Sequence, residues 1–190
     1  LGVIDTGGGS TEYAVGDGHD PEQTVSCEIG AVRLTEAVPA LAGRQGVVDL
    51  LTIERARSIA REALVPLTAF PPVERLALVG GSATTTAAVV RGKKGKLATF
   101  ELTRSDLQRA LVRLCALGYK ERKDLPGMKP QRADILPAGI IVLDAALELL
   151  QRDIATATTA DLLLGFLLQQ RDASPIHEHA GRMQPTRPRR

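Results

Sequence analysis

Three short segments at the start of the chain have the residue pattern of β-strands. Residues 1–4 (LGVI) are a mostly apolar run that ends at Asp5. Residues 11–15 are rich in β-branched and aromatic types, and apolar positions alternate with polar ones in residues 23–29. Such patterns predict strands, and the glycine-rich connection between the first two predicts a hairpin. We therefore expect an antiparallel start of three strands.

The rest of the chain shows mainly helical periodicity, with apolar residues recurring every three or four positions. Two further strands are expected, a buried one over 75–79 and a last one over 153–158. Capping residues mark helix starts: Thr52 is expected to cap one helix, and Thr103 with Asp106 resembles a capping box. Helices are predicted over residues 30–38, 52–70, 83–91, 103–117, 131–150 and 160–170.

The helix predicted over 131–150 is apolar nearly all round, so we expect it to be central and buried. It is not a membrane span, because Pro137, Asp144 and Glu148 interrupt its apolar run. The two acids lie one turn apart, and Arg152 follows a turn later. We expect these three charged side chains to form a structural ion pair.

Composition supports an α/β class. Of the 190 residues, 44% are hydrophobic but only 3% are aromatic and none is Trp, which indicates an aliphatic interior. The formal net charge of +2 is too small to identify a partner, so we expect neither a membrane nor a specific nucleic acid. Cys27 and Cys115 lie at apolar positions and are expected to be core thiols in a reducing compartment. The chain should therefore be soluble and cytoplasmic.

One domain-sized core is expected from the length, and the absence of an initiator Met suggests a fragment or processed chain. The domain is expected to span residues 1–171. Residues 172–190 are rich in Pro, Arg and His without periodicity, so a disordered basic tail is expected there.

The first candidate site follows the first strand. It is a run of three glycines and two hydroxyl residues: Gly7, Gly8, Gly9, Ser10 and Thr11. Consecutive glycines allow successive backbone N–H groups to point into one concavity, as phosphate binding requires. A Rossmann or Walker loop would open a helix, and a strand follows here instead. A plain tight turn is the alternative, but such a turn does not need three glycines flanked by Asp5 and Glu12.

The second candidate site joins the strand over 75–79 to the following helix. It consists of Gly80, Gly81 and Ser82. Glycines permit close backbone approach, and a helix N-terminus supplies free N–H groups and a positive dipole. The alternative is a strand-to-helix turn capped by Ser82.

Several segments resemble the exopolyphosphatase / guanosine pentaphosphate phosphohydrolase (Ppx/GppA) family of the actin–hexokinase–Hsp70 superfamily. LGVIDTGGGSTEYAVGDG resembles the opening of the second domain of these proteins. Three further stretches follow in the same order: IGAVRLTE at 29–36, LALVGGSATTTAAV at 76–89, and the helical part at 102–147. The resemblance covers about residues 1–168 and implies an RNase H-like domain, with a mixed sheet and flanking helices.

The resemblance implies release of terminal phosphate from inorganic polyphosphate or guanosine pentaphosphate. Both glycine loops would bind phosphate, Asp5 would hold Mg²⁺ or another divalent cation, and Glu12 would position the attacking water or the metal. Asp5 and Glu12 are therefore the expected catalytic residues. In this family a first domain precedes the second and carries the other wall of the cleft and the glutamate taken as base. A homodimer is a further expected partner.

Two other classes stay open at this stage. The triplet Asp5-Thr6-Gly7 also matches aspartic proteases, but their fold is almost entirely β and needs two such triplets. The chain could also be a non-catalytic module that binds phosphate or assembles with itself. In many family members the segment near the C-terminal end of this domain reads Gly-Leu-Arg-Glu-Gly. Residues 161–165 of this chain are DLLLG, so the Arg and Glu of that motif are missing here. The sequence does not separate polyphosphate from guanosine pentaphosphate.

Overall fold

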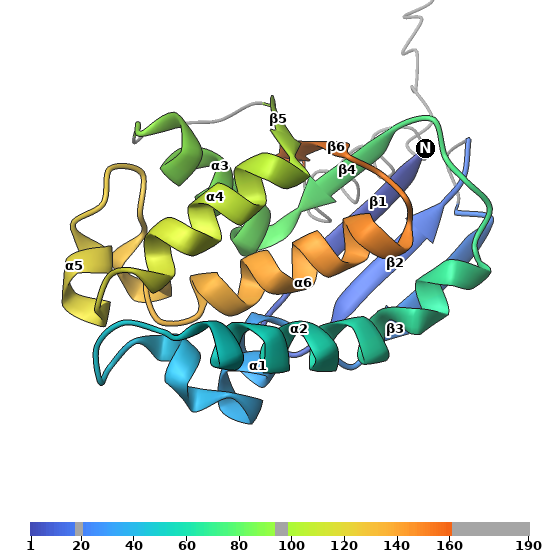
Figure 1. Ribbon diagram of the computed structural model, residues 1–190. Coiled ribbons are helices and arrows are strands. Elements are labelled where there is room, and N and C mark those ends of the chain that lie inside the picture. The colour runs from blue at the N-terminus through green and yellow to red at the C-terminus, as the bar shows by residue number, and fades with distance from the viewer. Residues whose placement is uncertain (18–20, 94–98, 161–190) are drawn as a thin grey trace, which may run out of the picture.

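A computed structural model describes residues 1–17, 21–93 and 99–160, and in this part the chain forms a six-stranded mixed sheet (Figure 1). The strand order is β3-β2-β1-β4-β6-β5. The first three strands are antiparallel neighbours, β1 and β6 each run parallel to β4, and β5 runs antiparallel to β6. The strands are β1 (Gly2–Thr6), β2 (Thr11–Val15), β3 (Gln23–Cys27), β4 (Leu76–Val79), β5 (Thr99–Thr103) and β6 (Ile154–Thr158).

The helices gather on one face of this sheet (Figure 1). They are α1 (Ala31–Ala37), α2 (Leu50–Leu64), α3 (Gly80–Arg91), α4 (Arg104–Cys115), α5 (Tyr119–Lys123) and α6 (Leu136–Leu149), with 3₁₀ turns η1 (Pro39–Ala42), η2 (Val65–Ala69) and η3 (Pro130–Arg132). Side chains alternate across the pleat, so Ile4, Tyr13 and Leu78 are buried on the helix side. The antiparallel three-strand start and the α/β class predicted from the sequence are confirmed.

Helix α6 is the centre of the helical layer. Every residue from 136 to 147 is buried, and the helix contacts α1, α2, α3 and α4. A helix that is apolar on all sides can bury its apolar surface only when neighbouring elements cover every side. The burial predicted for this helix is confirmed, but its start is not residue 131. Residues 130–132 form η3, and α6 begins at Leu136 with a proline in its first turn.

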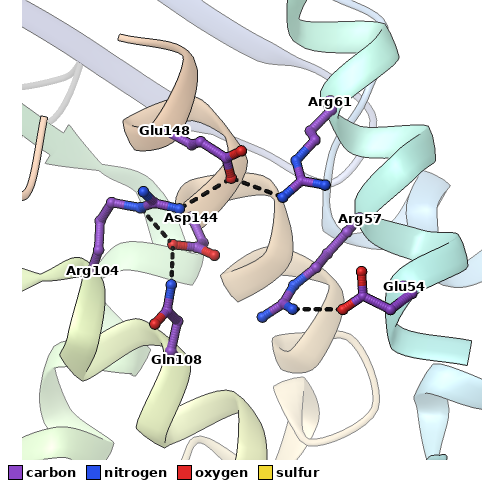
Figure 2. Close-up of polar contacts among 7 residues, drawn as sticks. All are labelled: Glu54, Arg57, Arg61, Arg104, Gln108, Asp144 and Glu148. Atoms are coloured by element: carbon purple, nitrogen blue, oxygen red, sulfur yellow. Dashed lines mark hydrogen bonds and ion pairs between the residues drawn. The ribbon is translucent and has the colours of Figure 1, made fainter. Parts of the chain in front are cut away.

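The C-terminal half of α6 carries two acids that tie neighbouring helices to it (Figure 2). Arg104, at the start of α4, donates from Nε to Asp144 Oδ1 at 2.9 Å and from Nη2 to Glu148 Oε2 at 3.0 Å. Arg61 on α2 reaches the same Glu148 oxygen, also at 3.0 Å. Asp144 is 5% exposed, and a carboxylate at that depth needs such partners because burial without them is costly. The two acids therefore join α2, α4 and α6.

The ion pair predicted between these acids and Arg152 is wrong. Helix α6 ends at Leu149, and Gln151 takes a positive φ of 54°. The chain thus leaves the helix before Arg152 could lie one turn beyond Glu148. Arg152 donates instead to the carbonyl of Glu74 at 2.7 Å, which joins the end of α6 to the segment before β4.

Two other local expectations need correction. Helix α2 is capped by Asp49, whose Oδ1 accepts from the Thr52 N–H at 2.8 Å, so Thr52 lies inside the helix rather than at its cap. Strand β5 was not predicted. The capping box of Thr103 and Asp106 at the start of α4 is confirmed. The helix expected over 160–170 and the tail 172–190 lie outside the described residues.

The two cysteines are buried and unpaired, as the sequence predicted. Burial raises the pKa of Cys115 to about 11, and burial together with the charge of Glu12 raises the pKa of Cys27. Both thiols are therefore protonated and poor nucleophiles at neutral pH. Among the described residues, no helix has the length and apolarity needed to cross a membrane.

Candidate functional site

The two glycine loops lie side by side, at the ends of two neighbouring strands. Strands β1 and β4 are parallel, with Asp5 opposite Val79, so residues 7–11 and 80–82 follow at the same edge of the sheet. Gly80 takes a φ of +87°, and a Cβ there would lie 2.6 Å from Asp5 Oδ1 and 2.9 Å from the Thr6 carbonyl oxygen. Only glycine fits this contact. The fold thus brings together two loops that are about seventy residues apart in the sequence.

The carbonyl groups of the hairpin loop anchor it to the start of α1. Those of Gly7 and Gly8 accept from the first backbone N–H groups of α1, at 2.9 to 3.0 Å. Gly30 makes this possible, because a Cβ there would lie 2.6 Å from the Gly8 oxygen. The N–H of Gly7 donates to the Ser10 carbonyl at 3.0 Å. With the carbonyls turned toward α1, the loop is fixed in one conformation.

The loop also has unused donors. Within the described part of the chain, the N–H groups of Gly8, Gly9 and Ser10 have no backbone acceptor, and the three glycines are exposed. Backbone donors that find no acceptor in the protein need solvent or a ligand. Three consecutive donors of this kind are what an anion-binding loop requires, so the structure leaves the predicted site open to a ligand.

Asp5 and Glu12 share the sheet face that is opposite to the helices. They are partners in the β1–β2 ladder, and residues paired in this way have Cβ atoms about 5 Å apart. Asp5 is half-buried and Glu12 is exposed. Ser26, the next residue along the same row on β3, donates from Oγ to Glu12 Oε1 at 2.9 Å. The two predicted catalytic carboxylates therefore lie beside each other at the root of the hairpin loop.

The second loop forms the first turn of α3. Val79 occupies the N-cap position, and its apolar side chain offers no acceptor to the first N–H groups of the helix. The cap proposed for Ser82 is therefore wrong: its Oγ is buried against α6, where a Cβ at Gly139 would lie 2.5 Å away. Ser82 can offer an anion its backbone N–H and not its hydroxyl.

Thr11 is a similar case on the hairpin side. It is fully buried, and its Oγ1 donates to the carbonyl of Ile29 at 2.7 Å. This bond ties β2 to the segment before α1. Of the two hydroxyls predicted to bind phosphate at this loop, only that of Ser10 is partly exposed.

Two arginines that the sequence did not single out lie at the loops. The guanidinium of Arg132, from η3, packs directly against Gly81, where any Cβ would collide with it. Arg33, in the first turn of α1, has Nη2 3.9 Å from the position of a Cβ on Gly9 and pairs with Glu28 at 2.8 Å. Both add positive charge next to backbone donors. No local sequence pattern indicates either arginine, because each reaches its loop only through the tertiary fold.

A divalent cation would find few protein ligands here. In the described ranges no three His, Cys, Asp or Glu side chains come together. Mg²⁺ is usually held by one or two carboxylates together with waters and substrate phosphates, rather than by an all-protein cage. The adjacent carboxylates of Asp5 and Glu12, next to the free N–H groups of the hairpin loop, fit that requirement.

Comparisons with known proteins show which proteins this chain resembles. A model of the Ppx/GppA phosphatase family matches residues 2–168. Exopolyphosphatase 2 of Mycobacterium tuberculosis is 33% identical over 177 residues, which cover 87% of this chain and 54% of the relative. A guanosine-5'-triphosphate,3'-diphosphate pyrophosphatase of Vibrio parahaemolyticus is 26% identical over 175 residues, or 90% of this chain and 33% of the relative. The chain thus spans about half, or less, of these relatives.

Solved structures give the same result. The crystal structure of the Aquifex aeolicus Ppx/GppA family member matches 92% of this chain with a TM-score of 0.80 and 25% identity, using 57% of its own length. An exopolyphosphatase from Cytophaga hutchinsonii matches 92% with a TM-score of 0.73 and 26% identity, again over 57% of that protein. The actin-like α/β fold expected from the sequence is thereby confirmed.

Proposed function

Because the chain belongs to the Ppx/GppA phosphatase family, we propose that it is one wall of a phosphatase cleft. The reaction proposed is release of the terminal phosphate from inorganic polyphosphate or guanosine pentaphosphate, the substrate classes that the names of its relatives suggest. The observation that carries the proposal is the juxtaposition of residues 7–11, residues 80–82 and two carboxylates at one sheet edge.

The chain's own groups suit a phosphoryl anion. Free N–H groups of Gly8, Gly9 and Ser10 would bind its oxygens from one side, and those at the start of α3 from the other. Arg132 and Arg33 would neutralise charge that grows on these oxygens as the terminal phosphate departs. Fixed donors of this kind need no rearrangement during the reaction, so their stabilisation is fully available to the transition state.

The two carboxylates have complementary positions. Asp5, half-buried between the loops, would hold Mg²⁺, and Glu12 would hold the metal or a water next to it. A Mg²⁺ ion held by Asp5 would supply positive charge that offsets the negative charge of the substrate phosphates. The hydroxyl of Ser26 fixes the Glu12 carboxylate, so this group is already oriented before substrate arrives.

We propose that the chain is half of the catalytic unit. It spans 54% of the Mycobacterium relative, and the general base expected from the family belongs to a preceding domain. Loss of a general base typically reduces a rate by about 10²–10⁴-fold even when the rest of a site is intact. The chain alone should therefore bind phosphate compounds with Mg²⁺ but hydrolyse them poorly.

Binding and turnover test this proposal separately. Calorimetric titration of the 190-residue chain with tripolyphosphate and Mg²⁺ should show binding that Asp5→Asn weakens about tenfold or more, since even residues that only orient metal ligands have effects of that size. Glu12→Gln should also weaken it. Glu101→Gln is the matched control, because it removes an exposed carboxylate from a distant strand of the same sheet.

Phosphate release completes the test. Adding the upstream domain should restore turnover, which Asp5→Asn and Glu12→Gln should then reduce without unfolding the protein. Equal binding by the unsubstituted chain and its three variants would show that the proposed site does not exist. Full-rate hydrolysis by the isolated chain would show that the catalytic apparatus has been assigned to the wrong half, whereas binding with no turnover even in the completed protein would favour a non-catalytic module.

A further inference from the structure

A second group of cations gathers around the ring of Tyr119. Arg44 and Lys123 both stack on the ring of Tyr119, with Arg44 Cζ 4.6 Å and Lys123 Nζ 4.2 Å from the ring centroid. These three residues are called the Tyr119 cluster below. Cations are attracted to an aromatic face by its quadrupole, but two like charges on one ring also repel each other. Their proximity is explained only if the surrounding structure holds them there.

The backbone supplies that support. The Tyr119 N–H donates to the carbonyl of Gly43 at 2.9 Å, which joins α5 directly to the loop that carries Arg44. Arg122, on the same short helix, is fully buried and donates from Nη1 to the Leu41 carbonyl at 2.8 Å. Helix α5 and residues 41–44 are thus fastened to each other at two points. The Tyr119 cluster is a preorganised feature rather than a chance meeting of flexible side chains.

Positive charge exceeds negative charge around the cluster. Residue 44 and residues 119–134 include six cations and three acids. Of the acids, Asp134 pairs with Arg44 at 2.9 Å and Glu121 accepts from the backbone N–H of Gly118 at 2.8 Å. Lys123 has no carboxylate within ion-pair distance in the described part of the chain. An anion would therefore relieve the repulsion between Lys123 and Arg44.

The cluster is continuous with the candidate phosphate site. Arg132 packs against Gly81 of the second loop, and Asp134, two residues later, holds Arg44. One short segment, residues 132–134, thus contacts the second loop through Arg132 and the Tyr119 cluster through Asp134. Figure 1 shows α5 at the same end of the molecule as the start of α6, which directly follows this segment.

We propose that the Tyr119 cluster binds the distal phosphates of a long anionic substrate whose terminal phosphate lies between the two glycine loops. This rests on the proposed function and selects linear polyphosphate, because a chain of many phosphates carries charge along its whole length and can extend from one place to the other. Each additional phosphate contact releases condensed counterions, so affinity for a polyanion rises with the number of contacts and falls steeply with salt. Compact substrates would use the glycine loops alone.

The test compares anion length. The 190-residue chain is titrated with tripolyphosphate and with long-chain polyphosphate in Mg²⁺, at several salt concentrations. Lys123→Gln should weaken long-chain binding about two- to fivefold, the range of an exposed ion pair, and lower its salt slope by about 0.7. Binding of tripolyphosphate should not change. Arg75→Gln is the matched control, since Arg75 is an exposed cation immediately before β4, at the end of that strand remote from Gly80.

Ring variants separate geometry from charge. Tyr119→Phe keeps the stacking surface and should bind long chains normally, whereas Tyr119→Leu keeps all charges and should lose affinity for long chains alone. A Lys123→Gln effect equal for both lengths, or equal to that of Arg75→Gln, would overturn the proposal while the phosphate site stands. Absence of binding to either anion by the unsubstituted chain would reject the proposed function and this inference together.

Discussion

Replacing Arg122 by Met should destabilise the chain by about 3 kcal/mol, because this cation donates to three carbonyl groups within 3.0 Å and more weakly to a fourth, that of Ala133, at 3.5 Å. Its side chain is fully buried. Nε donates to the Leu114 carbonyl at 2.7 Å and to that of Leu117 at 3.0 Å, and Nη1 donates to the Leu41 carbonyl at 2.8 Å. Burial lowers the pKa of Arg122 from its ordinary value, but a guanidinium keeps its proton.

The magnitude follows from two opposing contributions. Removal of the guanidinium leaves three carbonyl oxygens without this donor, at about 1–3 kcal/mol for each buried one. Against this, Met no longer requires a charge to be desolvated, which recovers part of the loss. Met also fills most of the space that the arginine stem occupies. A net loss of about 3 kcal/mol lowers the midpoint of thermal unfolding by about 6–12 °C for a chain of this size.

Urea and thermal unfolding, followed by circular dichroism, measure this change. Arg113→Met is the control, because Arg113 is an exposed arginine on α4 whose removal should alter stability by less than about 0.5 kcal/mol. The reasoning is refuted if Arg122→Met is as stable as the unsubstituted chain or more stable. Burial of the charge would then cost more than its hydrogen bonds return, as happens at some buried ion pairs.

Two further predictions concern the site and the response to acid. Gly80→Ala should lower stability by about 1–3 kcal/mol and weaken tripolyphosphate binding, because a Cβ at φ +87° is strained and would displace the Asp5 carboxylate. Unchanged affinity for tripolyphosphate would show that the contact between Gly80 and Asp5 does not contribute to binding. The hydroxyl and N–H of Thr103, together with Arg109, hold the pKa of Asp106 below its usual value of about 3.9. The Asp106 carboxylate therefore stabilises the fold fully above about pH 3.9, and this stabilisation is lost as the pH falls through the lowered pKa. Asp106→Asn should flatten this acid limb of the unfolding free energy, and parallel limbs for the two proteins would contradict the assignment.

Local patterns were sufficient where one short segment determines its own structure. The hairpin follows from three glycines between two strand-like segments, and the start of α4 from the capping box of Thr103 and Asp106. Strand β5 was missed because, in the described part of the chain, its five residues pair with β6 alone, more than fifty positions later. The end of α6 was predicted to within one residue, but the turn at Gln151 that follows it was not. Apolar composition shows that a helix is buried but not which direction the chain takes after it, and this produced the wrong partner for Glu148.

The candidate site was predictable to a similar extent. Asp5, Glu12 and the two glycine loops stand out in the sequence, and resemblance to a family allows them to be expected together. Arg132 reaches Gly81 only through the packing of η3 against α3, so no periodicity or motif indicates it. The inward rotation of Ser82 was equally hidden, since it depends on the close approach of Gly139 from α6.

The strand order has a consequence for synthesis on the ribosome. Strand β4 emerges early, but its second neighbour, β6, is made roughly 80 residues later, about 4–16 s at typical elongation rates. Throughout that interval β4 has an unpaired edge, and the apolar face of the sheet stays exposed until α6 is made and covers it. Nascent chains at this stage expose the kinds of surface that promote aggregation. Translation that stalls between residues 80 and 136 should therefore yield chains that depend on chaperones to remain soluble.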